Sequence, residues 1–280
     1  MSAADVDHFT RYLAELERVR SGGESRPGPP RDPENLVVVR RVASTNLLAR
    51  EIVADYEREA QDLHSLLILA LEQTSGRGRF GRTWSSAEGR GVYATRVLSM
   101  RNPELLQSLP LLVGAALCRA LSRHLPTPCR LKWPNDLVVE TPAGRRKIGG
   151  ILIEALVHPG EGAAAIIGFG VNHTQGEDEL PEGGTSVRLL GGPAEEALSL
   201  PQLTWDLVVA LEAELAHLGD LAYAVEAYRE LSVHRPGDSV SCRVGEETVE
   251  GTFQGFDDHG RLRLQRGGEE ILLSAGEIIE

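Results

Sequence analysis

Two continuous apolar runs, at residues 65–71 and 163–171, constrain the fold most strongly, because each has the length of a strand and is short for a helix. Around them, strand-like segments alternate with stretches whose apolar residues recur every three or four positions, as in an amphipathic helix. We expect helices over 3–20, 44–58, 108–125, 204–218 and 221–232, and further strands over 36–40, 91–98, 136–140 and 147–157. This order predicts an α+β fold, a mixed β-sheet with helices.

The sequence changes character at Arg235. From there to the end, strands of four to eight residues alternate with glycine turns, which is typical of a small β-barrel. Before the predicted sheet, a segment rich in glycine, proline and charge has the composition of a linker. The expected organisation is an N-terminal helix with a linker (1–34), a large α+β domain (35–234) and a small C-terminal β-domain (235–280).

Charge and cysteine content argue against several functional classes. The net charge of −12 is unfavourable for general nucleic-acid binding, which needs a basic face. No apolar run approaches the roughly 20 residues of a transmembrane helix, and the N-terminus does not have the pattern of a secretory signal. Three scattered cysteines suit neither a disulfide framework nor a zinc site. We therefore expect a reduced, cytoplasmic protein.

Lysine is nearly absent from this chain. Of its 29 basic residues, only Lys132 and Lys147 are lysines. They fall in two short motifs, KWPND at 132–136 and KIGGI at 147–151. An ammonium is a compact charge and a guanidinium a wide planar fork, so these positions indicate a role that arginine does not fill. Survival of two lysines by chance is the alternative.

Three further clusters lie where strands end. Residues 72–84 interleave three glycines with three arginines; glycines let a backbone approach a ligand, and arginines pair with phosphate oxygens. This segment is neither a Walker A loop nor a dinucleotide-binding fingerprint, and it predicts a phosphate-binding loop, a flexible solvated basic loop or a nucleic-acid contact. Ser-Thr-Asn at 44–46 opens a helix and serves as an N-cap, as a ligand contact, or as both. Gly-Phe-Gly-Val-Asn at 168–172 closes a strand.

In this order the clusters resemble the biotin protein ligases. The match consists of STN, GRGRxGRxW at 76–84, KWPND, KIGGIL, GxGxN and LPEGGTSV at 180–187, and the C-terminal segment resembles the family's SH3-like domain. Lipoate ligases and octanoyltransferases share the superfamily, but KWPND and the GRGR loop favour biotin. Two departures are visible. About 35 residues precede the core, where bifunctional members carry a DNA-binding domain, and Phe80 replaces a common basic residue.

The resemblance implies a catalytic domain of the class II synthetase and biotin ligase type. It implies ATP-dependent activation of biotin to biotinyl-5'-AMP, with Mg²⁺, and transfer of biotin to a lysine of a biotin carboxyl carrier protein. It further implies a monofunctional enzyme that binds neither DNA nor membrane, in a family that forms both monomers and homodimers. A lipoate-type ligase and a non-catalytic biotin or nucleotide sensor stay open as alternatives.

The same resemblance implies residue roles. The catalytic residues, which neutralise charge or, for Asp136, orient or deprotonate the incoming amine, are Lys147, Arg77, Arg79 and Asp136. The residues implied for biotin are Ser44, Thr45, Asn46, Gln73, Arg77, Gly78, Arg79, Lys147, Gly149, Gly150 and Gly170. The residues implied for ATP are Arg77, Arg79, Arg82, Trp84, Lys132, Asn135 and Asn172. No metal ligand is assigned with certainty, and Mg²⁺ is expected to bind through the ATP phosphates.

Overall fold

The computed structural model describes residues 8–21, 35–61, 63, 65–158, 162–194 and 197–279. Seven strands form a mixed sheet in the order β1-β2-β3-β7-β6-β5-β4. Only the β1–β2 pair is parallel, and the other neighbours run antiparallel. The strands are β1 (Asn35–Val42), β2 (Ser65–Gln73), β3 (Gly91–Met100), β4 (Arg130–Lys132), β5 (Asp136–Thr141), β6 (Gly144–His158) and β7 (Gly162–Asn172).

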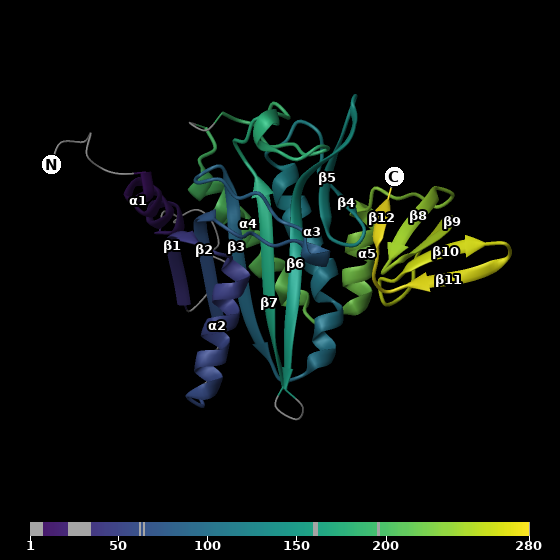
Figure 1. The fold of residues 1–280 in the computed structure, drawn as a ribbon, viewed down its shortest axis with the longest axis horizontal. Coiled ribbons are helices and arrows are strands. Elements are labelled where there is room, and N and C mark those ends of the chain that lie inside the picture. Colours follow the sequence, from purple (N-terminus) through teal and green to yellow (C-terminus); the bar gives the residue numbers. More distant parts are fainter. Residues whose placement is uncertain are drawn as a thin grey trace.

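Helices cover both faces of this sheet (Figure 1). They are α1 (His8–Ser21), α2 (Thr45–Arg58), α3 (Leu109–Ser122), α4 (Leu200–Glu214) and α5 (Leu221–Leu231). Helices α3, α4 and α5 share the large core with one face, and α2 packs on the other face through Ala49 and Val53. Every residue of β7 is buried, which explains why its sequence is continuously apolar and does not alternate.

The C-terminal part forms a separate five-stranded antiparallel sheet, in the order β11-β10-β9-β8-β12. Its strands are β8 (Ser239–Val244), β9 (Glu247–Phe256), β10 (Leu262–Arg266), β11 (Glu269–Leu273) and β12 (Glu277–Ile279). It packs beside α5, where the rings of Phe256 and Tyr228 meet edge to face at 5.3 Å between centroids. Phe253 and Phe256 belong to the same core cluster as α3, so the two sheets share one continuous core.

The expected α+β architecture is confirmed, with local differences. The sequence patterns missed β4 and β12, which have three residues each and are too short to show a period. Helix α4 begins at Leu200, not at Thr204, because Ser199 caps it by accepting from the backbone N–H of Gln202 at 3.3 Å. The helix expected over 108–125 ends at Ser122. Residues 3–7 of the first expected helix and most of the linker lie outside the described residues.

The described residues contain neither a membrane-spanning helix nor a cluster of metal-binding side chains. No helix there is long and apolar enough to cross a membrane. No group of three or more His, Cys, Asp or Glu side chains there is arranged to hold a metal ion.

Candidate active site

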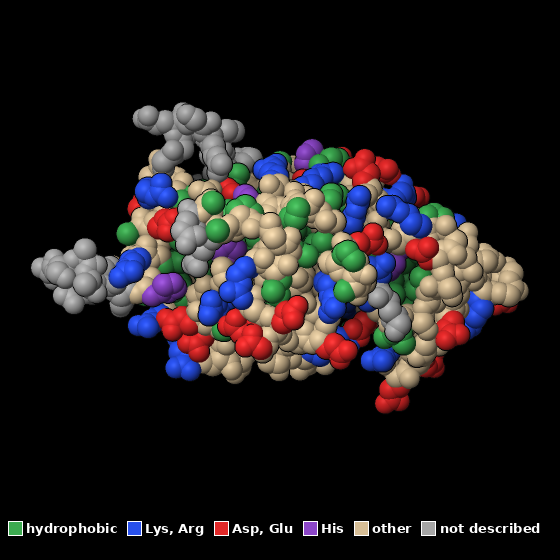
Figure 2. Space-filling view, turned by 90° about the horizontal axis from the view of Figure 1, so that it is seen from above, with side chains coloured by type: hydrophobic (Ala, Val, Ile, Leu, Met, Phe, Trp, Pro, Cys, Tyr) green, Lys and Arg blue, Asp and Glu red, His purple; other side chains and the backbone are tan. Residues whose placement is uncertain are grey.

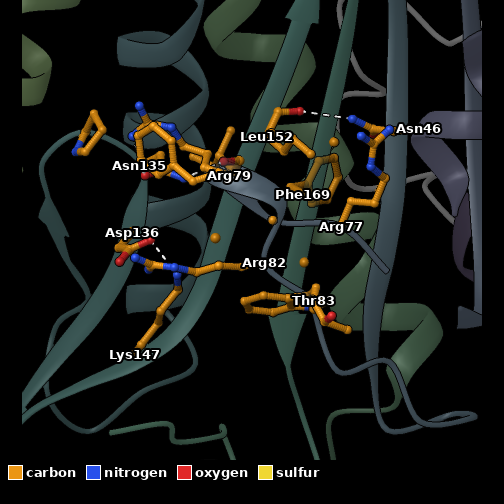
Figure 3. A pocket seen from close by; sticks show the side chains of 18 of the residues that line it. Asn46, Arg77, Arg79, Arg82, Thr83, Asn135, Asp136, Lys147, Leu152 and Phe169 are labelled. Atoms are coloured by element: carbon orange, nitrogen blue, oxygen red, sulfur yellow. Dashed lines mark hydrogen bonds and ion pairs between the residues drawn. The ribbon is translucent and has the colours of Figure 1, made fainter. Parts of the chain in front are cut away.

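A cleft of about 320 Å³ opens beside β6 and β7, under the glycine- and arginine-rich loop (Figure 3). The short motifs from distant parts of the sequence converge on it. Of the residues to which the resemblance gives a catalytic, biotin or ATP role, all line this cleft except Gly149 and Asn172. Residues outside that set also line it, some within the quoted motifs and some elsewhere: Phe80, Thr83, Ala94, Trp133, Pro134, Ile151, Leu152, Gly168, Phe169, Pro181, Glu277 and Ile278.

The loop is a compact turn held by its own backbone. Trp84 N–H donates to the Gly76 oxygen at 2.9 Å, and Gly78 N–H donates to the Arg82 oxygen at 2.8 Å. A Cβ on Gly76 would stand 2.4 Å from the Trp84 oxygen, so the turn requires glycine there. Phe80 at its tip has φ of 55°, and its side chain is 62% exposed. The loop therefore presents its arginines from a defined backbone.

The arginines of the loop reach toward the C-terminal sheet. The Arg79 guanidinium donates to Asn135 Oδ1 at 3.2 Å and to the Gly276 backbone oxygen at 3.1 Å. Arg82 forms a bidentate pair with the Glu277 carboxylate, and this pair holds the pKa of Glu277 below its usual value. Burial lowers the pKa of Arg79, although the negative charge of Asp136 acts to raise it.

Arg77 stands apart from these pairs. It lines the cleft, and among the described residues its guanidinium has neither an ion-pair nor a hydrogen-bond partner. It is therefore the loop arginine that is ready to meet an anion without first giving up a protein partner.

Lys147 lies opposite the loop and faces Asp136. Its Nζ is 2.6 Å from Asp136 Oδ1 and 5.6 Å from the centre of the Trp84 ring. Its backbone is fixed on both sides by the GGT segment: Lys147 N–H donates to the Gly183 oxygen, and Thr185 N–H donates to the Lys147 oxygen, each at 2.8 Å. The LPEGGTSV motif thus positions the lysine through backbone hydrogen bonds.

The strand glycines make room for Trp84. A Cβ on Gly170 would stand 2.5 Å from Trp84 Nε1, and one on Gly150 would stand 3.5 Å from the same ring. The Trp84 Nε1–H is buried and has no acceptor among the residues that the structure describes. A Cβ added to Gly149 would point away from the cleft, since it would stand 2.8 Å from the Leu137 side chain. Gly150 and Gly170 form one wall of the cleft, and Gly149 is a packing residue.

Asn172 lies outside the cleft. It is 5% exposed, and its Nδ2 donates to the Thr185 oxygen at 2.9 Å. Its backbone oxygen accepts from Val187 N–H at 3.2 Å. The resemblance implied an ATP contact for this residue, whereas its contacts in the structure anchor the segment that holds Lys147.

Polar side chains gather at the α2 end of the cleft. Gln73 Oε1 accepts from Thr45 N–H at 2.9 Å, and Gln73 Nε2 donates to Ser86 Oγ at 2.9 Å. Ser44 stands at the N-cap position of α2, but its side chain makes no capping bond and lines the cleft. Thr95, whose hydroxyl lies 2.8 Å from Thr45 Oγ1, was missed by the sequence because it sits inside a buried strand without a motif.

The cleft thus combines a polar end, a glycine wall and a strongly cationic end. Such a cleft fits an extended ligand with a polar head and an anionic tail that meets phosphate. A mixed sheet with this cleft and a small C-terminal β-domain places the protein in the class of ligases that attach cofactors. Residues 38–172 match the biotin/lipoate A/B protein ligase family, and residues 237–279 match the biotin protein ligase C terminal domain.

Comparisons with individual proteins narrow this class, and the chain belongs to the biotin protein ligase family. It is 30% identical to the biotin--[acetyl-CoA-carboxylase] ligase of Mycobacterium tuberculosis over 87% of this chain and 88% of that one. It is also 30% identical to the ligase of the same name from Paracoccus denitrificans, over 76% of this chain and 90% of that one.

Solved structures and longer relatives agree with this assignment. The biotin protein ligase from Aquifex aeolicus in complex with biotin and ATP matches with a TM-score of 0.67 and 25% identity, over 88% of this chain and 98% of that chain. The match to the bifunctional ligase/repressor BirA of Salmonella typhimurium, at 29% identity over 74% of this chain, spans only 63% of that longer protein.

Proposed function

We propose that this protein activates biotin with ATP and transfers it to a lysine of a biotin carboxyl carrier protein. One observation carries the proposal: a single cleft brings together both lysines of the chain, the three loop arginines and the polar Ser-Thr-Asn cluster. The name of the Mycobacterium tuberculosis relative and the ligands of the Aquifex aeolicus structure support the same substrates.

In the first step, a biotin carboxylate oxygen bonds to the α-phosphorus of ATP, and the bond to the β-phosphate oxygen breaks. Biotinyl-5'-AMP and pyrophosphate result. The step brings an anion against a polyanion, so it depends on positioning and charge neutralisation. Arg77 and Lys147 supply positive charge from opposite sides of the cleft, and Arg79 adds a third cation held by Asn135. Lys132 and Arg82 extend the cationic end that receives the remaining phosphates.

In the second step, the nitrogen of the carrier lysine bonds to the biotinyl carbonyl carbon, the bond from that carbon to AMP breaks, and the amine gives its proton to the Asp136 carboxylate or to water. Negative charge grows on the carbonyl oxygen and on the departing phosphate, where Lys147 stabilises it. Asp136, 2.6 Å from Lys147 Nζ, holds the ammonium before substrates bind and orients the incoming amine when Lys147 turns to the phosphate.

Mg²⁺ fits this cleft only through the nucleotide. The two cleft carboxylates, Asp136 and Glu277, are already paired with Lys147 and Arg82. Mg²⁺ binds readily through one or two carboxylates plus substrate phosphates and retains several waters. We therefore assign the ion to the ATP phosphates, where it would neutralise the leaving pyrophosphate.

We also propose that the chain does not recognise DNA. The net charge is −12, and on the face shown in Figure 2 acidic and basic side chains are interspersed. Sequence-selective retardation of a duplex, weakened by salt, would contradict this proposal.

Mass spectrometry tests the proposed activity. Protein mixed with ATP, Mg²⁺ and biotin should form biotinyl-5'-AMP, and an added carrier domain should gain one biotinyl group on a lysine. Lipoate in place of biotin should give no adenylate, which separates this function from that of a lipoate ligase. Binding of biotin and ATP without any adenylate would instead identify a sensor.

A further inference from the structure

The side-chain amide of Asn46 is held in one orientation. Its Nδ2 donates to the Leu152 oxygen at 3.3 Å and to Glu154 Oε2 at 3.0 Å; Figure 3 draws the contact with Leu152. Its Oδ1 accepts from the Thr95 hydroxyl at 2.7 Å. A carbonyl and a carboxylate can only accept, so both place the amide nitrogen toward β6 and the amide oxygen toward Thr95.

Glu154 is the charged member of this arrangement. Its second oxygen accepts from Arg50 at 3.1 Å, one helical turn after Asn46, so the carboxylate ties two turns of α2 to β6. The Glu154 side chain is 20% exposed and the Arg50 side chain 43%. A flipped Asn46 amide would set its oxygen against this carboxylate at hydrogen-bond distance, which is repulsive. Glu154 therefore contributes most to the orientation.

This orientation decides which polar atoms meet a ligand at the α2 end of the cleft. Asn46 Oδ1 lies over the bare backbone of Gly168, where a Cβ would stand only 2.2 Å away. An amide oxygen has two lone pairs, of which Thr95 uses one, so the other is an acceptor for a ligand N–H. Beside it, Ser44 and the second proton of Gln73 Nε2 are donors for a ligand carbonyl.

We propose that Glu154 is a positioning residue that makes the cleft selective for head groups with N–H donors, by holding the Asn46 amide oxygen toward the ligand. The cyclic urea of biotin offers both N–H donors and a carbonyl, whereas the dithiolane ring of lipoate offers neither. The inference rests on the proposed function, because it takes the urea ring as the head group. It assigns the discrimination between biotin and lipoate to Glu154, a residue behind the cleft wall.

Binding measurements on the full chain test this role. Glu154→Leu removes the acceptor and the charge, and we expect the Kd for biotin to rise about 10- to 100-fold, because a polar group in the site loses its partner. The KM for ATP should stay unchanged. Glu154→Gln should keep most of the affinity, since its amide oxygen still accepts from Asn46. Glu270→Leu, which breaks the Arg263 pair at 2.7 Å on the C-terminal sheet, is the control and should have no effect.

A modified ligand separates positioning from general loosening. Biotin methylated on both urea nitrogens has no N–H donor, so the parent protein should prefer biotin strongly, and Glu154→Leu should narrow that preference. If Glu154→Leu weakens the binding of biotin and of methylated biotin equally, or of biotin and ATP together, the substitution has disturbed the strand. Either result would refute the positioning role. If the parent binds biotin and Glu154→Leu binds it with the same Kd, the role is also refuted. A parent that fails to bind biotin at all refutes the proposed function itself.

Discussion

At the scale of single residues, Lys147 is the sharpest case. Its ammonium lies 2.6 Å from Asp136 and 5.6 Å from the centre of the Trp84 ring, and its backbone is fixed by Gly183 and Thr185. A guanidinium is wider and planar, so it would not place its charge at the point that the ammonium occupies between Asp136 and the Trp84 ring. This geometry explains why position 147 is a lysine in a chain whose other basic residues are nearly all arginines.

Lys147→Arg should reduce biotinyl-5'-AMP formation by at least about 100-fold, because a misplaced charge no longer meets the carboxylate and the α-phosphate together. Thermal melting without ligands should hardly change. Initial rates of adenylate formation measure the effect, with Arg146→Lys on the same strand as the matched control. A variant within a few-fold of the parent rate would mean that the two lysines survived by chance.

His173 should make the stability of the protein sensitive to acid. Burial lowers its pKa from 6.5 to about 4, with nearby His124 adding to the effect and the Leu198 backbone opposing it. The unfolded chain binds this proton more tightly, so the contribution of the neutral ring is complete above pH 6.5 and is lost as the pH falls toward 4. Each pH unit below 6.5 costs up to about 1.4 kcal/mol.

Melting temperatures at pH 7 and pH 5 measure this contribution. The parent should lose more stability between these two values than His173→Gln does, and exposed His259→Gln should behave like the parent. A parent and a His173→Gln variant with equal pH dependence would show that another group controls acid sensitivity in this window.

At the scale of elements, the loop of residues 76–84 joins the two parts of the molecule. Arg79 contacts Gly276, just before β12, and Arg82 contacts Glu277 of β12, while Arg79 also contacts Asn135 of the large domain. The position of the loop therefore depends on the C-terminal sheet.

Arg79→Gly should leave some adenylation but release the intermediate, because the loop loses its bonds to Asn135 and Gly276 and shields the mixed anhydride poorly. The expected result is biotin on exposed lysines of an unrelated protein added to the reaction. Arg101→Gly, outside the cleft, is the control. Retention of the adenylate equal to that of the parent would count against a shielding loop.

At the scale of the whole molecule, the two sheets share a core. Phe256 contacts Tyr228 of α5 and Phe253 within its own sheet, and all three are buried. Within the large domain, a buried Arg96–Glu212 pair at 2.6 Å ties β3 to α4. These contacts predict that the large domain and the C-terminal sheet unfold together.

Phe256→Ala should cost about 3–5 kcal/mol and lower the melting temperature of the entire protein in one calorimetric transition. Leu272→Ala, at a side chain that is 39% exposed on the same small sheet, should change little. Two separate transitions in the variant or the parent would show that the sheets are thermodynamically independent.

The sequence by itself determined most of the elements and most of the cleft. Apolar periodicity is a local property, so it located every α-helix of the described chain and the longer strands. The motifs carry chemistry in their residue types, and the family resemblance that they carry implied a common site for Lys147, Arg77 and Gln73, all of which line one cleft. The order of the motifs along the chain, and not the spacing between them, indicated that they belong to one site.

Only the tertiary structure decided which residues complete and support that cleft. Glu277 and Gly276 reach it because β12 pairs with β8, although nothing near the chain end resembles a site. Glu154 acts through Asn46, more than a hundred positions away, and Asn172 turns from the cleft to hold Thr185. Such contacts depend on how strands are ordered and where they end, and a pattern within a single segment contains no information about its spatial neighbours.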